Sequence, residues 1–197
     1  MRSLDLGYNN IKYITRNYFE PIRSSLTHLV LRHNQLTNIS RDIYSEMEHL
    51  HWLDFSNNRI QLVDSDAFIN TKSLQVLLLD HNEISEIYQD MLIQSPSLQI
   101  VSLAHNKLRF LPDTLFHDTQ LEIFDVSHNL ISKMPENCLS RVSDTLRHFD
   151  ISHNQLTILN PEQVISHPQL NFLHSLKDLV KKNPVKFCIE AVMKVFG

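Results

Sequence analysis

Apolar residues recur along the chain at fixed offsets from an asparagine, in the pattern L-x-x-L-x-L-x-x-N-x-L. The segments "LVLRHNQL", "LLLDHNEI" and "FDISHNQL" are three of seven copies. Successive copies are 25, 24, 24, 24, 23 and 25 residues apart, a period that indicates a solenoid of stacked coils. The asparagines that mark the copies are Asn9, Asn34, Asn58, Asn82, Asn106, Asn129 and Asn154.

Each copy is expected to contain a short strand, because successive side chains along a strand point to opposite faces. In "LQVLLLD", Leu77 and Leu79 are predicted to point inward, and Val76, Leu78 and Asp80 outward. One coil cannot bury its apolar residues alone, so the coils must stack and their strands form a parallel sheet. The return half of two copies has the inward residues Ile60, Val63, Phe68, Leu74, Leu108, Leu111, Phe116 and Leu121.

The repeated asparagine stands where the chain leaves the strand and bends. Asparagine tolerates unusual backbone angles, and its amide offers two donors and one acceptor. We therefore predict a structural asparagine ladder that satisfies backbone groups at each bend. Loss of one such amide is expected to cost about 1–3 kcal/mol of stability.

The seven copies resemble the leucine-rich repeats, in particular the 24-residue class found mostly in extracellular proteins. The segments "LAHNKLRFLPDTLF" and "DTLRHFDISHNQL" also resemble a cell-surface adhesion member of that family. The resemblance implies an α/β repeat fold, a curved solenoid with a parallel β-sheet on its concave face. It further implies a function in protein binding. Paired carboxylates need a closed pocket for acid–base catalysis, which an open curved sheet does not offer, so we expect no enzymatic activity.

The solenoid is predicted to occupy residues 1–173, with seven repeats and a partial eighth. No N-terminal cap precedes the first repeat, although the end of a solenoid is normally covered. We interpret the chain as an internal piece of a longer protein. In the eighth repeat, Ser175 and Asp178 replace the expected leucine and asparagine, so residues 174–197 are treated as a divergent tail.

The tail contains a sequence typical of an amphipathic helix at residues 184–196. Asn183 is a candidate cap and Pro184 suits the first turn. This helix could cover the open end of the stack, or the tail could be unrelated to the repeat protein. Its apolar face would consist of Val185, Cys188, Ile189, Val192, Val195 and Phe196.

Composition and charge exclude several classes of function. The chain is 42% hydrophobic with a formal net charge of −4, which argues against disorder and against nucleic-acid binding. Gly7 and Gly197 are the only glycines, so Gly-rich phosphate loops and a GxSxG motif are absent. Cys138 and Cys188 are too few for a disulfide scaffold or a zinc site. No apolar run approaches the ~20 residues of a membrane helix.

The side chains that point outward from the strands form the candidate partner-binding site. Apolar groups with one tryptophan, flanked by acids, are typical of an interaction surface. Burial by neighbouring groups is the alternative for the apolar residues, and solvated scaffolding is the alternative for the acids. The candidates are His28, Val30, Trp52, Asp54, Val76, Leu78, Asp80, Ile100, Ile123, Asp125, His148 and Asp150.

Histidine precedes the ladder asparagine in five copies. Stacked histidines could in principle bind zinc, but Tyr8 and Asn57 take the same place in two copies and no carboxylate recurs beside them. We interpret the histidines as exposed turn residues with a modest response to pH, and we expect no metal and no cofactor. They are His33, His81, His105, His128 and His153.

The tripeptide "NIS" at residues 38–40 is an N-glycosylation sequon with Asn38 just past a strand. It favours an extracellular or cell-surface location as part of a longer parent protein. The first residues, "MRSLDLGYNN", lack the apolar segment of a signal peptide.

Three functions fit these patterns. The leading hypothesis is a module that binds another protein on its concave face in an adhesion or receptor setting, with a like molecule as one candidate partner. The second is a cytosolic regulatory scaffold, against which the 24-residue period counts. The third is a structural spacer without a partner of its own.

Overall fold

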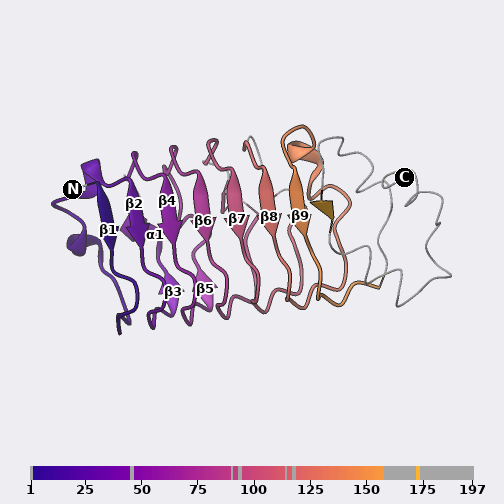
Figure 1. Cartoon of the computed structure of the whole chain (residues 1–197), viewed down its shortest axis with the longest axis horizontal. Coiled ribbons are helices and arrows are strands. Elements are labelled where there is room, and N and C mark those ends of the chain that lie inside the picture. The colour runs from indigo at the N-terminus through magenta and orange to yellow at the C-terminus, as the bar shows by residue number, and fades with distance from the viewer. Residues whose placement is uncertain are drawn as a thin grey trace.

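The structure is a computed structural model that describes residues 2–44, 47–89, 91–92, 95–113, 115–116, 119–157 and 172–173. The tail at 174–197, with the helix predicted at 184–196, lies outside the described residues. In the described part, the chain forms successive coils whose strands stand side by side along the long axis (Figure 1).

One parallel sheet of eight strands runs through the molecule in the order β1-β2-β4-β6-β7-β8-β9-β10. Each coil contributes one strand, as the repeat period predicts. The strands are β1 (Ser3–Asp5), β2 (His28–Val30), β4 (Trp52–Asp54), β6 (Val76–Leu78), β7 (Ile100–Ser102), β8 (Ile123–Asp125), β9 (His148–Asp150) and β10 (Phe172–Leu173).

The return segments run on the other side of the coils. Strands β3 (Asn38–Ile39) and β5 (Leu62–Val63) pair in a second, two-stranded parallel sheet (Figure 1). Among the described residues, the remaining regular elements are the four-residue helix α1 (Arg41–Tyr44) and three 3-10 helices. The 3-10 helices are η1 (Arg16–Tyr18), η2 (Arg23–Ser25) and η3 (Ser140–Val142).

Equivalent positions of the repeats align across the eight-stranded sheet. A shift of one residue would turn every inward side chain outward, so the buried face strongly specifies the register. The middle residue of each strand from β2 to β9 is fully buried or nearly so, and Leu77 and Leu79 are both 0% exposed, as predicted. These middle residues are Leu29, Leu53, Leu77, Val101, Phe124 and Phe149.

The core lies between the sheet and the return segments. The predicted inward residues of the return segments are all buried, from Leu111 at 5% exposure down to Ile60, Leu74, Leu108 and Leu121 at 0%. Aromatic rings join neighbouring coils within this core. The ring of Phe124 meets Phe116 edge-on at 4.7 Å and stacks with Phe149 at 5.7 Å.

The amide of Asn82 shows how the coils are joined. Its Nδ2 donates to the carbonyl oxygens of Leu79 at 3.0 Å and Asp80 at 3.2 Å within its own bend. The same Nδ2 donates to Phe55 O of the preceding coil at 3.1 Å, and Oδ1 accepts from Ile60 N at 3.0 Å. Each amide therefore closes its own bend and holds the bend before it.

The same two links to the preceding coil recur at every ladder position from Asn34 to Asn154. Asn9 is exposed and makes two local bonds, to Leu6 O and Gly7 O. Unpaired polar groups are costly only where water is excluded, so the ladder contributes most where it is buried. The buried members are Asn34, Asn58, Asn82, Asn106 and Asn129.

The expectation that the ladder asparagine itself takes the unusual backbone angles is wrong. The residue before it has the left-handed conformation, with φ of 54° at His81 and 56° at Asn57. That conformation turns the backbone so that the next side chain, the asparagine, points into the coil and reaches the carbonyls there. The left-handed residues at this position are Tyr8, His33, Asn57, His81, His105, His128 and His153.

Candidate protein-binding face

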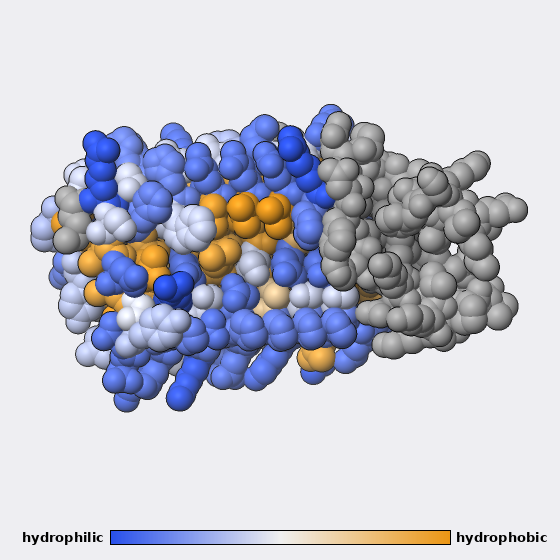
Figure 2. Space-filling view, in the orientation of Figure 1, coloured by the Kyte–Doolittle hydropathy of each residue, from blue (hydrophilic) through white to orange (hydrophobic). Residues whose placement is uncertain are grey.

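The concave face of the solenoid is formed by the outward side chains of the eight-stranded sheet. Its first row, which we call the apolar row, runs from Trp52 through Val76 and Ile100 to Ile123 on adjacent strands. His28 precedes this row and His148 follows it. Figure 2 shows a hydrophobic patch in the middle of this face, bordered by hydrophilic residues.

The members of the apolar row differ in exposure. Val76 is 8% exposed because its neighbours cover it, whereas Trp52, Ile100 and Ile123 are half-buried. Leu78, on the second outward row, is also half-buried and widens the patch on β6. Neighbouring side chains therefore cover part of the row, and Trp52, Ile100, Ile123 and Leu78 remain partly accessible.

The acids of the second row hold the turns that follow their strands. Oδ1 of Asp125 accepts a hydrogen bond from Ser127 N at 2.9 Å, and Oδ1 of Asp150 accepts one from Ser152 N at 2.8 Å. Asp54 is 4% exposed, and its Oδ1 accepts from both N and Oγ of Ser56. Asp54 is therefore a scaffold residue, while Asp125 and Asp150 combine a turn role with partial exposure.

Asp80 lies one row further along, beyond the end of β6. Burial raises its pKa, and the negative charges of Asp54 and Asp125 raise it further. A backbone hydrogen bond and the neighbouring His81 act in the opposite direction. The concave face thus carries a concentration of negative charge beside the apolar row.

A stack of imidazole rings, which we call the histidine column, borders the acids. The ring centroids of His81, His105, His128 and His153 are 4.0 to 4.1 Å apart, with interplanar angles of 10 to 12°. Burial lowers the pKa of His105, and the other three histidines lower it further, while Asp125 raises it. A stack of parallel rings presents separate edges to solvent, and the described residues contain no group of three side chains fit to hold a metal.

Sequence reasoning located these histidines and aligned them at the strand spacing, but it did not predict that their rings lie face to face. The available signal was their constant offset from the ladder asparagine, together with the strand spacing of about 4.8 Å. Asn57 interrupts the column on one side, and beyond it Tyr8 stacks on His33 at 4.3 Å. The column therefore follows from the left-handed turns, each of which aims its ring the same way.

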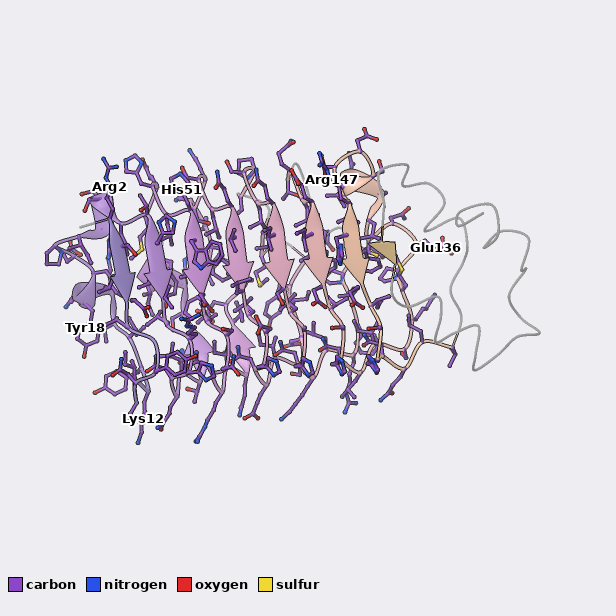
Figure 3. All side chains as sticks on the ribbon, viewed as in Figure 1. Arg2, Lys12, Tyr18, His51, Glu136 and Arg147 are labelled. Carbon is purple, nitrogen blue, oxygen red and sulfur yellow. The ribbon has the colours of Figure 1, made fainter. Side chains whose placement is uncertain are left out.

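The borders of the concave face are polar and solvated. Figure 3 places His51 and Arg147 along one edge of the sheet and Lys12 beyond the other. Arg147 forms an exposed ion pair with Glu122 at 3.9 Å, and Lys107 forms one with Glu83 at 2.9 Å. Pairs of this kind contribute little to stability, so these borders mainly keep the rim hydrated.

The sequon residue Asn38 is exposed on β3, in the sheet of the return segments. Its Nδ2 donates a hydrogen bond to Ser40 Oγ at 2.7 Å, and Asn38 pairs in register with Leu62. The side chain is therefore outside the eight-stranded sheet that forms the concave face.

The repeated coils, the parallel sheet and the buried asparagine ladder define the class of protein. Residues 24–84 match the family described as leucine rich repeat, and residues 145–166 match a second leucine rich repeat description. The chain is a leucine-rich repeat protein. None of the helices among the described residues has the length and apolar composition of a membrane span.

Within that class the chain is similar to chaoptin. It is 54% identical to chaoptin of Drosophila melanogaster over 161 residues, which are 81% of this chain and 12% of that protein. Chaoptin of Tribolium castaneum is 53% identical over 161 residues, which are 21% of its length. The chain therefore spans a small part of the length of these relatives.

Solved structures of leucine-rich repeat proteins share the fold. The leucine-rich repeat domain of APL1 matches with a TM-score of 0.73 and 29% identity, over 88% of this chain and 42% of that one. Toll in its complex with Spatzle, from Drosophila, matches with a TM-score of 0.70 and 31% identity, over 79% of this chain and 22% of that one.

Proposed function

We propose that the chain binds another protein through its concave face, as part of an extracellular cell-adhesion protein, and that a like molecule is one such partner. The observation that carries this proposal is the apolar row, in which Trp52 on β4, Ile100 on β7 and Ile123 on β8 are partly exposed. The similarity of the chain to chaoptin, and to Toll in its complex with Spatzle, supports a protein partner at the cell surface.

Beads coated with the purified chain test the proposal. They are expected to aggregate, and the Trp52→Ser and Ile100→Ser variants are expected to weaken the association at least about tenfold, because central apolar anchors dominate interface energies. Phe110→Ser is the matched control, since Phe110 is 70% exposed and lies outside the eight-stranded sheet.

The outcomes separate the parts of the proposal. If the unmodified chain and its Trp52→Ser, Ile100→Ser and Phe110→Ser variants aggregate beads equally, the concave face has no role in binding. If uncoated and coated beads behave alike, the like-molecule partner is excluded. In that case, binding of the labelled chain to cell surfaces is compared with that of the Trp52→Ser variant. If the chain does not bind, or if the variant binds equally well, the chain is a structural spacer without a partner on this face.

The extracellular location makes a separate prediction. When the chain is secreted behind a signal peptide, Asn38 is expected to carry an N-linked glycan, because it is an exposed sequon residue. Gel mobility before and after glycosidase treatment measures this. Ser40→Ala should remove the shift, whereas Asn10→Gln, at an exposed asparagine without a sequon, should leave it. Secreted protein with unmodified Asn38 would contradict the prediction.

A further inference from the structure

The concave face combines an apolar stripe with negative charge on one side of it. The apolar row consists of side chains on β4, β6, β7 and β8, and Asp80, Asp125 and Asp150 lie on the rows beside it, all half-buried. Burial and two neighbouring acids already disfavour the charged form of Asp80, as its raised pKa records. Positive groups of a partner would relieve this concentration of negative charge.

We propose that the partner segment is a basic amphipathic α-helix that lies across the strands, with its apolar side on the row from Trp52 to Ile123 and its lysines or arginines over Asp80, Asp125 and Asp150. This inference rests on the proposed function and names the chemistry of the partner at that same face.

The spacing of the row matches a helix. Adjacent strands are about 4.8 Å apart, and side chains at helical positions i, i+3 and i+4 are about 5–6 Å apart. Alternate side chains of an extended segment are separated by about 6.7 Å, which fits the row less well. Four strand steps, from Trp52 to His148, make about 19 Å, the length of a helix of about 13 residues.

The hydrogen bonds of the partner's backbone also favour a helix over an extended segment. Val76, Ile100 and Ile123 carry no donors or acceptors, so an extended backbone laid on them would lose its bonds to water without replacement. A helix satisfies its backbone groups internally except at its ends. The apolar row can therefore bury a helix face at low cost.

Two titratable groups make this binding sensitive to pH. As pH falls, Asp80 loses its negative charge at a higher pH than an ordinary aspartate because burial raises its pKa. His105, whose pKa burial lowers, gains positive charge at a lower pH than an ordinary histidine. The charged groups that act on Asp80 are His81, Asp54 and Asp125, and those that act on His105 are His81, His128, His153 and Asp125. Both changes reduce the attraction for a basic helix.

Synthetic peptides of about 14 residues test the inference by fluorescence anisotropy with the full chain. The first has leucine at helical i, i+3, i+4 and i+7 spacing with lysine beside it. The second replaces lysine with glutamate, and the third alternates lysine and leucine so that the same composition favours a strand. The lysine helix is expected to bind with a Kd on the order of 10 µM and at least about tenfold more tightly than either control.

Variants of the chain assign the contacts. Asp80→Asn together with Asp125→Asn is expected to weaken the lysine helix about threefold to tenfold, and asparagine retains the Oδ1 that accepts the hydrogen bond from Ser127. Between pH 7.4 and 5.5 the affinity should fall, and His105→Asn should reduce that fall. Asparagine is a suitable replacement because Asn57 has the same left-handed backbone.

Equal binding of the lysine and glutamate helices, or tighter binding of the alternating peptide, would overturn the inference. If the lysine helix does not bind while Ile100-dependent bead aggregation persists, the inference of a basic helical partner is wrong and the proposed function stands. Self-association that the bound peptide does not inhibit would also overturn it, because a second copy would then occupy a different surface.

Discussion

Replacing Asn82 with alanine is expected to lower the free energy of unfolding by about 3 kcal/mol, as measured by urea denaturation followed by circular dichroism. Asn82 is buried, and its loss leaves Ile60 N without its acceptor. Phe55 O and Leu79 O each lose one of two amide donors and keep the other, from Asn58 and Asn106. Water cannot replace the lost acceptor inside the coil, so the cost is that of one unsatisfied backbone N–H together with the lost bonds between the coils.

Asn9→Ala is the matched control for this change. Asn9 has the same position in its repeat, but it is exposed and bonds only to Leu6 O and Gly7 O. Its replacement should cost less than about 1 kcal/mol, because water can solvate the groups that it leaves. Equal destabilisation by the two variants would show that the links between coils are not what the ladder contributes.

Phe124→Ala is expected to be more severe, with a loss of about 4 kcal/mol. Phe124 is 1% exposed, meets Phe116 edge-on and stacks with Phe149, so its removal opens a cavity shared by neighbouring coils. Phe124→Leu should cost clearly less, because it leaves a smaller void. Thermal and urea unfolding of both variants measure the difference.

The control for this cavity is Phe110→Ala, at a phenylalanine that is 70% exposed. Its effect should fall within about 0.5 kcal/mol, as for most surface substitutions. If Phe124→Ala were no more harmful than Phe110→Ala, the coils would not share a packed aromatic core at this position.

The repeat period was sufficient to predict the sheet and its register. A constant offset between apolar residues determines which side chains turn inward, and Leu77, Leu79 and the return-segment residue Phe68 are buried as predicted. Sequence placed the candidate face on the outward positions, and the structure brings Trp52 and Ile100 into one row through β6.

Details of the bend could not be predicted in the same way. Histidine and asparagine both tolerate the left-handed conformation, so the pattern alone did not show that His81 adopts it while Asn82 turns inward. The stacking of His81 on His105 depends on side-chain angles that the period does not specify. Asp54 was grouped with the outward acids, but the adjacent Ser56 hydroxyl draws its carboxylate into a local turn.

The fluorescence of Trp52 tests the binding role of the concave face most directly, because it is the only tryptophan in the chain and stands at one end of the apolar row. Binding of a protein partner or of the lysine helix should exclude water from the indole and shift its emission to shorter wavelength, saturating with the same Kd as the anisotropy. A complex that forms by anisotropy or sedimentation while the emission of Trp52 stays unchanged would place the partner on another surface.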